Sequence, residues 1–126
     1  MLGLPEDKGL EGVFIGVIEG LAEKDPQRAM RCVEAISDED ERDKALPYLV
    51  SGWTKNDPAA AARWVETLPK DKFQYVAMSL LGQWLFTGDE SSQIAAKHWV
   101  DQLPDEEMRH AAMFQYLVLG RYFASI

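Results

Sequence analysis

The chain has 126 residues, of which 47% are hydrophobic and 27% charged, a composition that fits one globular domain and excludes a disordered or collagen-like chain. Its formal net charge of −8 argues against nucleic acid or an anionic lipid surface as a partner, because phosphate groups repel acidic proteins. No stretch approaches the roughly 20 apolar residues of a membrane span, and there is no signal-peptide pattern and only one cysteine, so we expect no membrane insertion and a cytoplasmic location.

Hydrophobic periodicity and helix-capping residues predict an all-α fold of seven helices. In chain order, the predicted helices span residues 8–24, 26–36, 38–55, 58–68, 70–86, 91–103 and 105–123. Asp25 and Asp57 each precede a proline, which is typical of a helix start because the aspartate accepts hydrogen bonds from free amides and the proline needs no partner. Ser37 is the expected cap of the third helix.

A two-residue anchor recurs along the chain. It consists of an aliphatic residue followed by proline or serine, at Leu4-Pro5, Ile36-Ser37, Leu68-Pro69 and Leu103-Pro104, with intervals of 32, 32 and 35 residues. The Asp-Pro pairs that begin at 25 and 57 have the same period of 32 residues. We therefore predict one helical-repeat domain over residues 1–126, with units at 5–36, 37–68 and 69–103 and a half-unit at 104–126.

The second helix of each unit carries the clearest motif. Residues 61–68 place alanine, tryptophan, valine and leucine on one apolar stripe, and residues 96–103 repeat this pattern. Ala60, Trp64 and Pro69 resemble the alanine, large aromatic residue and closing proline of the tetratricopeptide repeat, although the first-helix motif of that family is not reproduced. The unit Asp-Pro…Trp…Leu-Pro is also similar to a tandem repeat of bacterial proteins. The resemblance implies an α-solenoid, a right-handed superhelix-like stack of about three helix-turn-helix repeats that serves as a protein-binding scaffold.

The leading functional hypothesis is a non-enzymatic module that binds a protein or peptide in a groove lined by the longer helices. No catalytic motif is present, and no cofactor is implied. The candidate groove residues are mostly polar or tyrosine positions beside the buried stripe, namely Tyr48, Ser51, Lys55, Gln83, Trp84, Gln115 and Tyr122. Of the four tryptophans, Trp84 lies next to its helix's stripe and is the one most expected to be partly exposed. An alternative is a structural spacer within a longer repeat protein, with no ligand of its own.

A helical metalloprotein is a further alternative. Glu107 and His110 lie one helical turn apart, as in the Glu-x-x-His element of di-iron bundles, and His98 and Asp101 have the same spacing. A di-iron site needs two such elements and two further inward glutamates, so solvated surface histidines are favoured and no metal is expected.

Trp64 and Trp99 occupy equivalent positions of successive units, so we expect both in the core between repeats. Cys32 holds the same position in the first unit. This position predicts a buried and unreactive thiol, since a reactive cysteine needs an exposed, electropositive setting.

The last predicted helix, 105–123, is apolar around most of its circumference, which favours burial on more than one face. No polar capping repeat follows it. We expect either a homodimer or a fragment of a longer array. The predicted self-association residues are Phe114, Leu117, Val118 and Phe123.

Overall fold

The computed structural model describes residues 8–86 and 89–124, with side chains described within 14–86 and 89–122. Within these ranges the chain forms seven α-helices and no strand, which confirms the predicted all-α fold. The helices are α1 (Lys8–Lys24), α2 (Pro26–Glu34), α3 (Glu39–Asn56), α4 (Pro58–Val65), α5 (Lys70–Phe86), α6 (Glu90–Gln102) and α7 (Glu106–Ala124). The helices α2 and α4 end before the predicted residues 36 and 68, because the chain there closes into tighter turns, with the Ile36 amide bonding Val33 O and the Leu68 amide bonding Val65 O.

The helix starts follow the local sequence. Asp25 and Asp57 each accept a hydrogen bond from the backbone amide three residues on, at 3.2 and 3.1 Å, with a proline in the first turn as predicted. The cap of α3 is Asp38 rather than Ser37, since the Asp38 carboxylate accepts bonds of 2.9 and 3.4 Å from the amides two and three residues on. A carboxylate suits this position better than a hydroxyl because it also carries the negative charge that a helix N-terminus favours.

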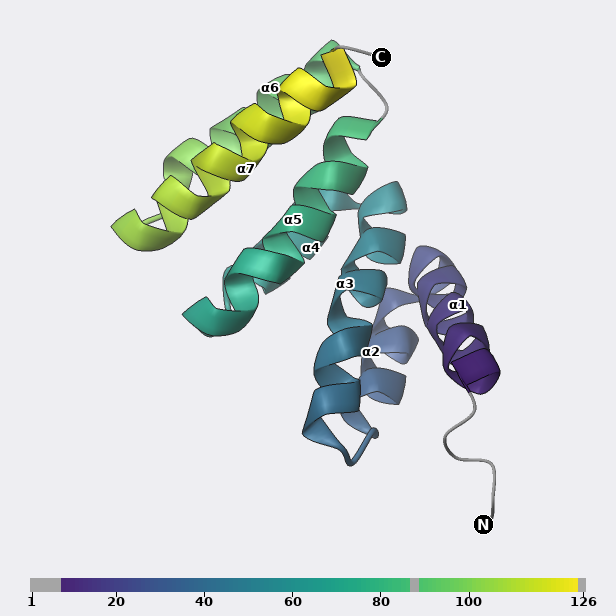
Figure 1. The fold of residues 1–126 in the computed structure, drawn as a ribbon. Helices are drawn as coiled ribbons and strands as arrows, with labels where there is room; N and C mark the ends of the chain where they lie inside the picture. The colour runs from purple at the N-terminus through teal and green to yellow at the C-terminus, as the bar shows by residue number, and fades with distance from the viewer. Residues whose placement is uncertain (1–7, 87–88, 125–126) are drawn as a thin grey trace.

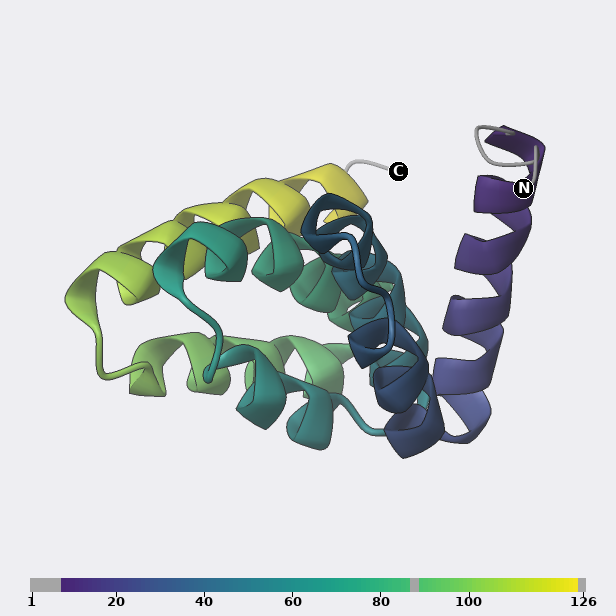
Figure 2. The ribbon, with the colours of Figure 1, turned by 90° about the horizontal axis from the view of Figure 1, so that it is seen from below.

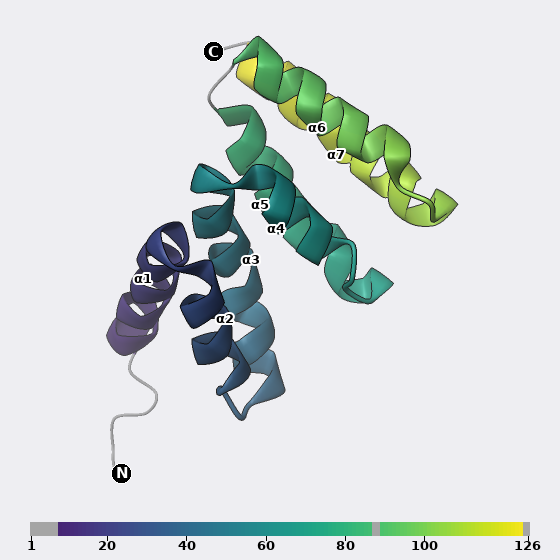
Figure 3. The same cartoon turned by 180° about the vertical axis from the view of Figure 1, so that it is seen from behind.

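The seven helices lie in two layers (Figures 1 and 2). The longer helices α1, α3, α5 and α7, called the A helices below, pack directly against one another in chain order. The shorter helices α2, α4 and α6, called the B helices, cover the other side and rest mainly on the A helices (Figure 3). Among the residues described, none of the helices combines the length and apolar character that crossing a bilayer requires.

A single hydrophobic core runs between the two layers. The alanine and valine positions of the predicted B-helix stripe are all buried, at Ala29, Val33, Ala61, Val65, Ala96 and Val100. The A helices contribute fully buried side chains such as Leu49, Phe73 and Leu81. Burying one large apolar side chain stabilises the fold by about 1.5–3 kcal/mol, so the buried side chains of both layers together stabilise the packing of A and B helices.

One polar contact recurs with the sequence repeat. Arg42 Nη1 donates a hydrogen bond of 2.9 Å to Ile36 O, and Arg109 Nη1 donates one of 2.8 Å to Leu103 O. Both carbonyls belong to the aliphatic anchor that follows a B helix, and both arginines lie six residues further on, in the first turns of the next A helix. The arginines thus satisfy carbonyls that a helix end leaves without an intrahelical partner.

The contact between α1 and α3 depends on one glycine. A Cβ atom added at Gly52 would clash with the backbone oxygen of Glu19 and lie 2.9 Å from Ala22 Cβ. The two helices therefore approach more closely than any larger residue would allow. At Gly16, Gly20, Gly82 and Gly120 an added Cβ would have no atom within 4 Å.

Candidate functional site

A polar link crosses three A helices on their surface. The Ser51 hydroxyl of α3 lies 3.0 Å from Glu19 Oε2 of α1 and 3.1 Å from Gln83 Oε1 of α5. The three residues are spaced 32 apart and therefore hold one repeat position. Lys55 Nζ adds a contact of 3.9 Å with the same Glu19 carboxylate. Ser51, Lys55 and Gln83, all predicted as groove residues, are thus brought together.

Beside this link lies a shallow hollow with two tyrosines. Its volume is about 470 Å³, and it is lined by residues from α1, α3 and α5, namely Ile15, Lys44, Pro47, Tyr48 and Tyr75. Tyr48, a predicted groove residue, and Tyr75 are each 39% exposed. The Tyr75 hydroxyl donates a hydrogen bond of 3.3 Å to Asp43 O, which holds its ring over α3. Burial raises the pKa of the Tyr75 phenol, and the Asp43 charge raises it further, so this group is a neutral donor at ordinary pH.

We call the set Glu19, Tyr48, Ser51, Tyr75 and Gln83 the A surface. Sequence reasoning missed two of its members, Glu19 and Tyr75. A signal for Glu19 was present, since it holds the same repeat position as the predicted Ser51 and Gln83. Tyr75 shares its repeat position with Asp43, and only the structure shows that its side chain reaches back across α3.

Gln115 and Tyr122 were also predicted as groove residues, and neither belongs to the A surface. Gln115 is buried, with 8% exposure, and its Nε2 donates a hydrogen bond of 2.8 Å to Gln74 O. This part of α7 packs against α5 and turns the Gln115 amide inward. Tyr122, near the end of α7, is exposed.

Trp84 is buried, with 7% exposure, so the expectation that it is partly exposed was wrong. Its ring packs against that of Trp99, with centroids 6.3 Å apart, and Trp99 is itself 8% exposed. Trp99 Nε1 donates a bond of 2.8 Å to Glu66 Oε2, which fixes the ring. The expectation of a core position is confirmed for Trp99, whereas Trp64 is only half-buried and packs 6.0 Å from the Trp53 ring.

Cys32 is exposed rather than buried. At the equivalent position Trp99 reaches toward Glu66, at the end of the preceding B helix. Among the residues that the structure describes, no B helix precedes α2, and the Cys32 thiol is left uncovered.

The residues of the metalloprotein alternative have other partners. Glu107 Oε1 lies 2.9 Å from Lys70 Nζ, and Asp101 Oδ2 lies 2.9 Å from Lys97 Nζ. Lys70 also lies 3.2 Å from Asp105, and hydrogen bonds to Glu107 and Asp105 raise the pKa of the lysine. Among the side chains described, in residues 14–86 and 89–122, no three histidine, cysteine or acidic groups come together as metal ligands.

The outer face of α7 carries a row of exposed apolar side chains. Phe114 is 69% exposed, and Leu117 and Val118 are also exposed. Their spacing places all three on one side of the helix. Phe123, the fourth predicted self-association residue, lies outside the described side chains.

Searches for similar proteins among family models, curated proteins and solved structures found no match.

Proposed function

We propose that the chain is a non-enzymatic scaffold that binds a peptide segment of a partner protein across the A surface. The observation that carries this proposal is the continuity of that surface over α1, α3 and α5, where Ser51 joins Glu19 and Gln83 beside the Tyr48–Tyr75 hollow. A binding surface that crosses three helices suits an extended peptide better than a small molecule.

The chemistry of the A surface suits this role. Tyrosines supply large contact areas at a low cost in side-chain entropy, and they are enriched where proteins meet. The serine, glutamine and carboxylate groups offer both donors and acceptors to a peptide backbone. The net charge of −8 gives no support to nucleic acid as the partner.

The architecture proposed for this scaffold is a tetratricopeptide-like α-solenoid with a right-handed superhelical stack. Support comes from the alternation of A and B helices, the packing of A helices in chain order, and the recurrence of the aspartate caps and the arginine contacts. Solenoids of this kind present extended surfaces for protein binding.

A display selection of random peptides on the wild-type chain tests the function. Enriched peptides are then measured by fluorescence anisotropy against a Tyr48→Ser/Tyr75→Ser double variant. We expect affinity to fall at least about tenfold, since truncating an aromatic hot spot costs about 2 kcal/mol or more. Ile94→Ser is the matched control, because it removes an exposed apolar side chain from α6, away from the A surface. Equal affinity for wild type and the double variant would exclude the A surface and favour the spacer alternative.

A second proposal is self-association through α7, favoured by its row of exposed apolar residues. The simplest arrangement is a two-fold dimer in which the same face meets itself. Light scattering over a hundredfold range of concentration tests this proposal. Leu117→Glu is the variant expected to disrupt the dimer, and Gln93→Glu, at an exposed position of α6, is the control. A monomer at every concentration for all three chains would contradict this proposal.

A further inference from the structure

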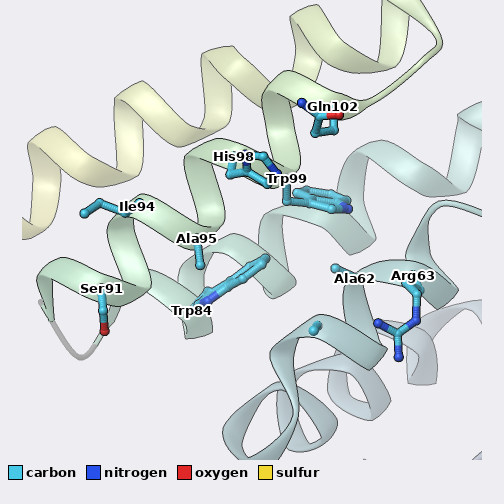
Figure 4. A pocket seen from close by; sticks show the side chains of 10 residues that line it. Ala62, Arg63, Trp84, Ser91, Ile94, Ala95, His98, Trp99 and Gln102 are labelled. Atoms are coloured by element: carbon cyan, nitrogen blue, oxygen red, sulfur yellow. The ribbon is translucent and has the colours of Figure 1, made fainter.

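On the opposite side from the A surface, the helices α4 and α6 diverge and leave a pocket of about 560 Å³ (Figure 4). The indole rings of Trp84 and Trp99 lie along this pocket, and the small side chains of Ala62 and Ala95 leave the space between the two helices open. A pocket of this volume with mainly apolar walls is typical of sites that bury a small organic molecule. The rings are held in place, since Trp99 donates to Glu66 and packs against Trp84 with the two ring planes tilted by 46°.

The charge of the pocket differs from that of the whole chain. The chain has 21 acidic and 13 basic residues, yet the residues that line the pocket include Arg63 and His98 and no acidic side chain. Arg63 and His98 hold one repeat position, being 35 residues apart on successive B helices. Both basic residues therefore line the same pocket, one from α4 and one from α6.

The polar groups of the pocket have spare donors. Among the described residues, neither the Arg63 guanidinium nor the Trp84 Nε1 group has a hydrogen-bond or ion-pair partner. Arginine forms paired hydrogen bonds with a carboxylate, and an indole N–H is a donor only. The pocket thus combines aromatic walls, the permanent positive charge of Arg63 and unused hydrogen-bond donors, and no negatively charged side chain lines it.

We infer that this pocket is a second binding site, independent of the peptide-binding A surface, and that its ligand is a small planar aromatic molecule with a carboxylate. The aromatic ring would lie against Trp84 and Trp99, and the carboxylate would face Arg63. A neutral or cationic ligand would leave the arginine charge unused and is disfavoured. The apolar face of α7 in a second copy is also disfavoured, since it carries Arg121 rather than an acidic residue.

The probe for this inference is naphthalene-2-carboxylate, with the uncharged naphthalene-2-carboxamide as its isosteric control. The four tryptophan indole N–H signals of the ¹⁵N-labelled chain are followed by NMR during titration. We expect saturable shifts of the Trp84 and Trp99 signals with a Kd of about 1 mM, in line with the efficiency of ligands of this size. The Trp53 signal, from the α3 core, should move least. The amide should bind about two- to fivefold more weakly, since Arg63 is exposed and a screened ion pair contributes little.

Two variants with matched controls locate the site. Arg63→Gln should reduce carboxylate binding by the same two- to fivefold and leave amide binding unchanged. Arg31→Gln, at the same repeat position on α2 but outside the pocket, should change neither. Ala95→Phe fills the pocket from an exposed position and should abolish the shifts, whereas Gln93→Phe on the same helix should not.

Three results would overturn the inference. The first is an absence of shifts at saturating probe, and the second is binding that survives Ala95→Phe. The third is equal affinity for carboxylate and amide, which would remove the role of Arg63. If the Trp84 signal instead moved on dilution of the protein alone, a second copy would be the occupant and the small-molecule site would be excluded. None of these results bears on the A surface, whose test depends on the Tyr48→Ser/Tyr75→Ser variant.

Discussion

The two gaps between successive B helices differ sharply, although the repeat makes them equivalent. Beside α2 and α4 there is a cavity of about 170 Å³, lined mainly by α2 and α3, with Met30 and Trp64 among its lining residues. Between α4 and α6 the cavity has a volume of about 560 Å³. Met30 of α2 and Ala62 of α4 hold the same repeat position, so a large side chain fills the first gap and a methyl group leaves the second open.

The A helices differ at an equivalent position in a related way. Gly52 of α3 and Trp84 of α5 are equivalent positions, 32 residues apart. At Gly52 the neighbouring A helix comes close, whereas at Trp84 an indole reaches through the A layer to the B side. A repeat therefore fixes where helices lie, and a few positions in each copy decide whether the space between them is closed or available to a ligand.

The largest expected effect concerns the two tryptophans that line the open gap. Trp84→Ala and Trp99→Ala should each lower the free energy of unfolding by about 3–5 kcal/mol, since both rings are nearly fully buried. Trp64→Ala, at the half-buried ring beside the closed gap, should cost clearly less. Urea denaturation midpoints of the three variants give the order. If Trp64→Ala lowered the free energy of unfolding more than Trp84→Ala, the Trp84 ring would not be packed more tightly than the Trp64 ring.

Gly52 provides the next test. Gly52→Ala should cost about 1–3 kcal/mol, because the new methyl group meets the Glu19 backbone and α1 must move away from α3. Gly82→Ala is the control, since its added Cβ has open space and alanine stabilises a helix by up to about 1 kcal/mol relative to glycine. Thermal unfolding of both variants measures the two effects. Equal stabilisation by the two alanines would show that α1 and α3 do not approach closely.

Met30→Ala should open the closed gap at a smaller cost, about 1–2 kcal/mol, because this side chain is only partly buried. The variant should also enlarge the cavity beside Trp64, which lines the same space. A shift of the Trp64 indole N–H signal, with the Trp99 signal unchanged, would report this. If both signals stayed in place, Met30 would not be what closes the gap.

The smallest effect concerns Asp105, which accepts a bond of 3.0 Å from the Met108 amide at the start of α7 and lies beside Lys70. These contacts hold the pKa of Asp105 below its ordinary value, with the amide bond the larger cause. A lowered pKa stabilises the folded state at pH values above the ordinary pKa of aspartate, and the stabilisation is lost as the pH falls through the lowered value. Asp105→Asn should therefore be less stable than wild type at pH 7, and the difference in urea midpoints should shrink at pH 3. A difference that is the same at both pH values would exclude the carboxylate charge as its source.

Much of the fold was predictable because its determinants are local. The apolar spacing of residues 61–68 and the Asp-Pro pair at 57 act within one or two helical turns, and the structure places the helices within a few residues of the prediction. The site was less predictable, since it depends on contacts between helices. The burial of Trp84 and Gln115 depends on the side chain or backbone group that each contacts on a neighbouring helix. The repeat pattern in the sequence does not predict these contacts.

The proposed function rests on the A surface, and mapping a selected peptide onto the chain tests it most directly. Backbone amide shifts of the labelled chain are measured while the tightest-binding peptide is added. We expect the largest shifts in α1, α3 and α5 around Tyr48, Ser51, Tyr75 and Gln83, with α6 and its pocket unaffected. Shifts confined to α6, to the pocket or to α7 would contradict peptide binding by the A surface.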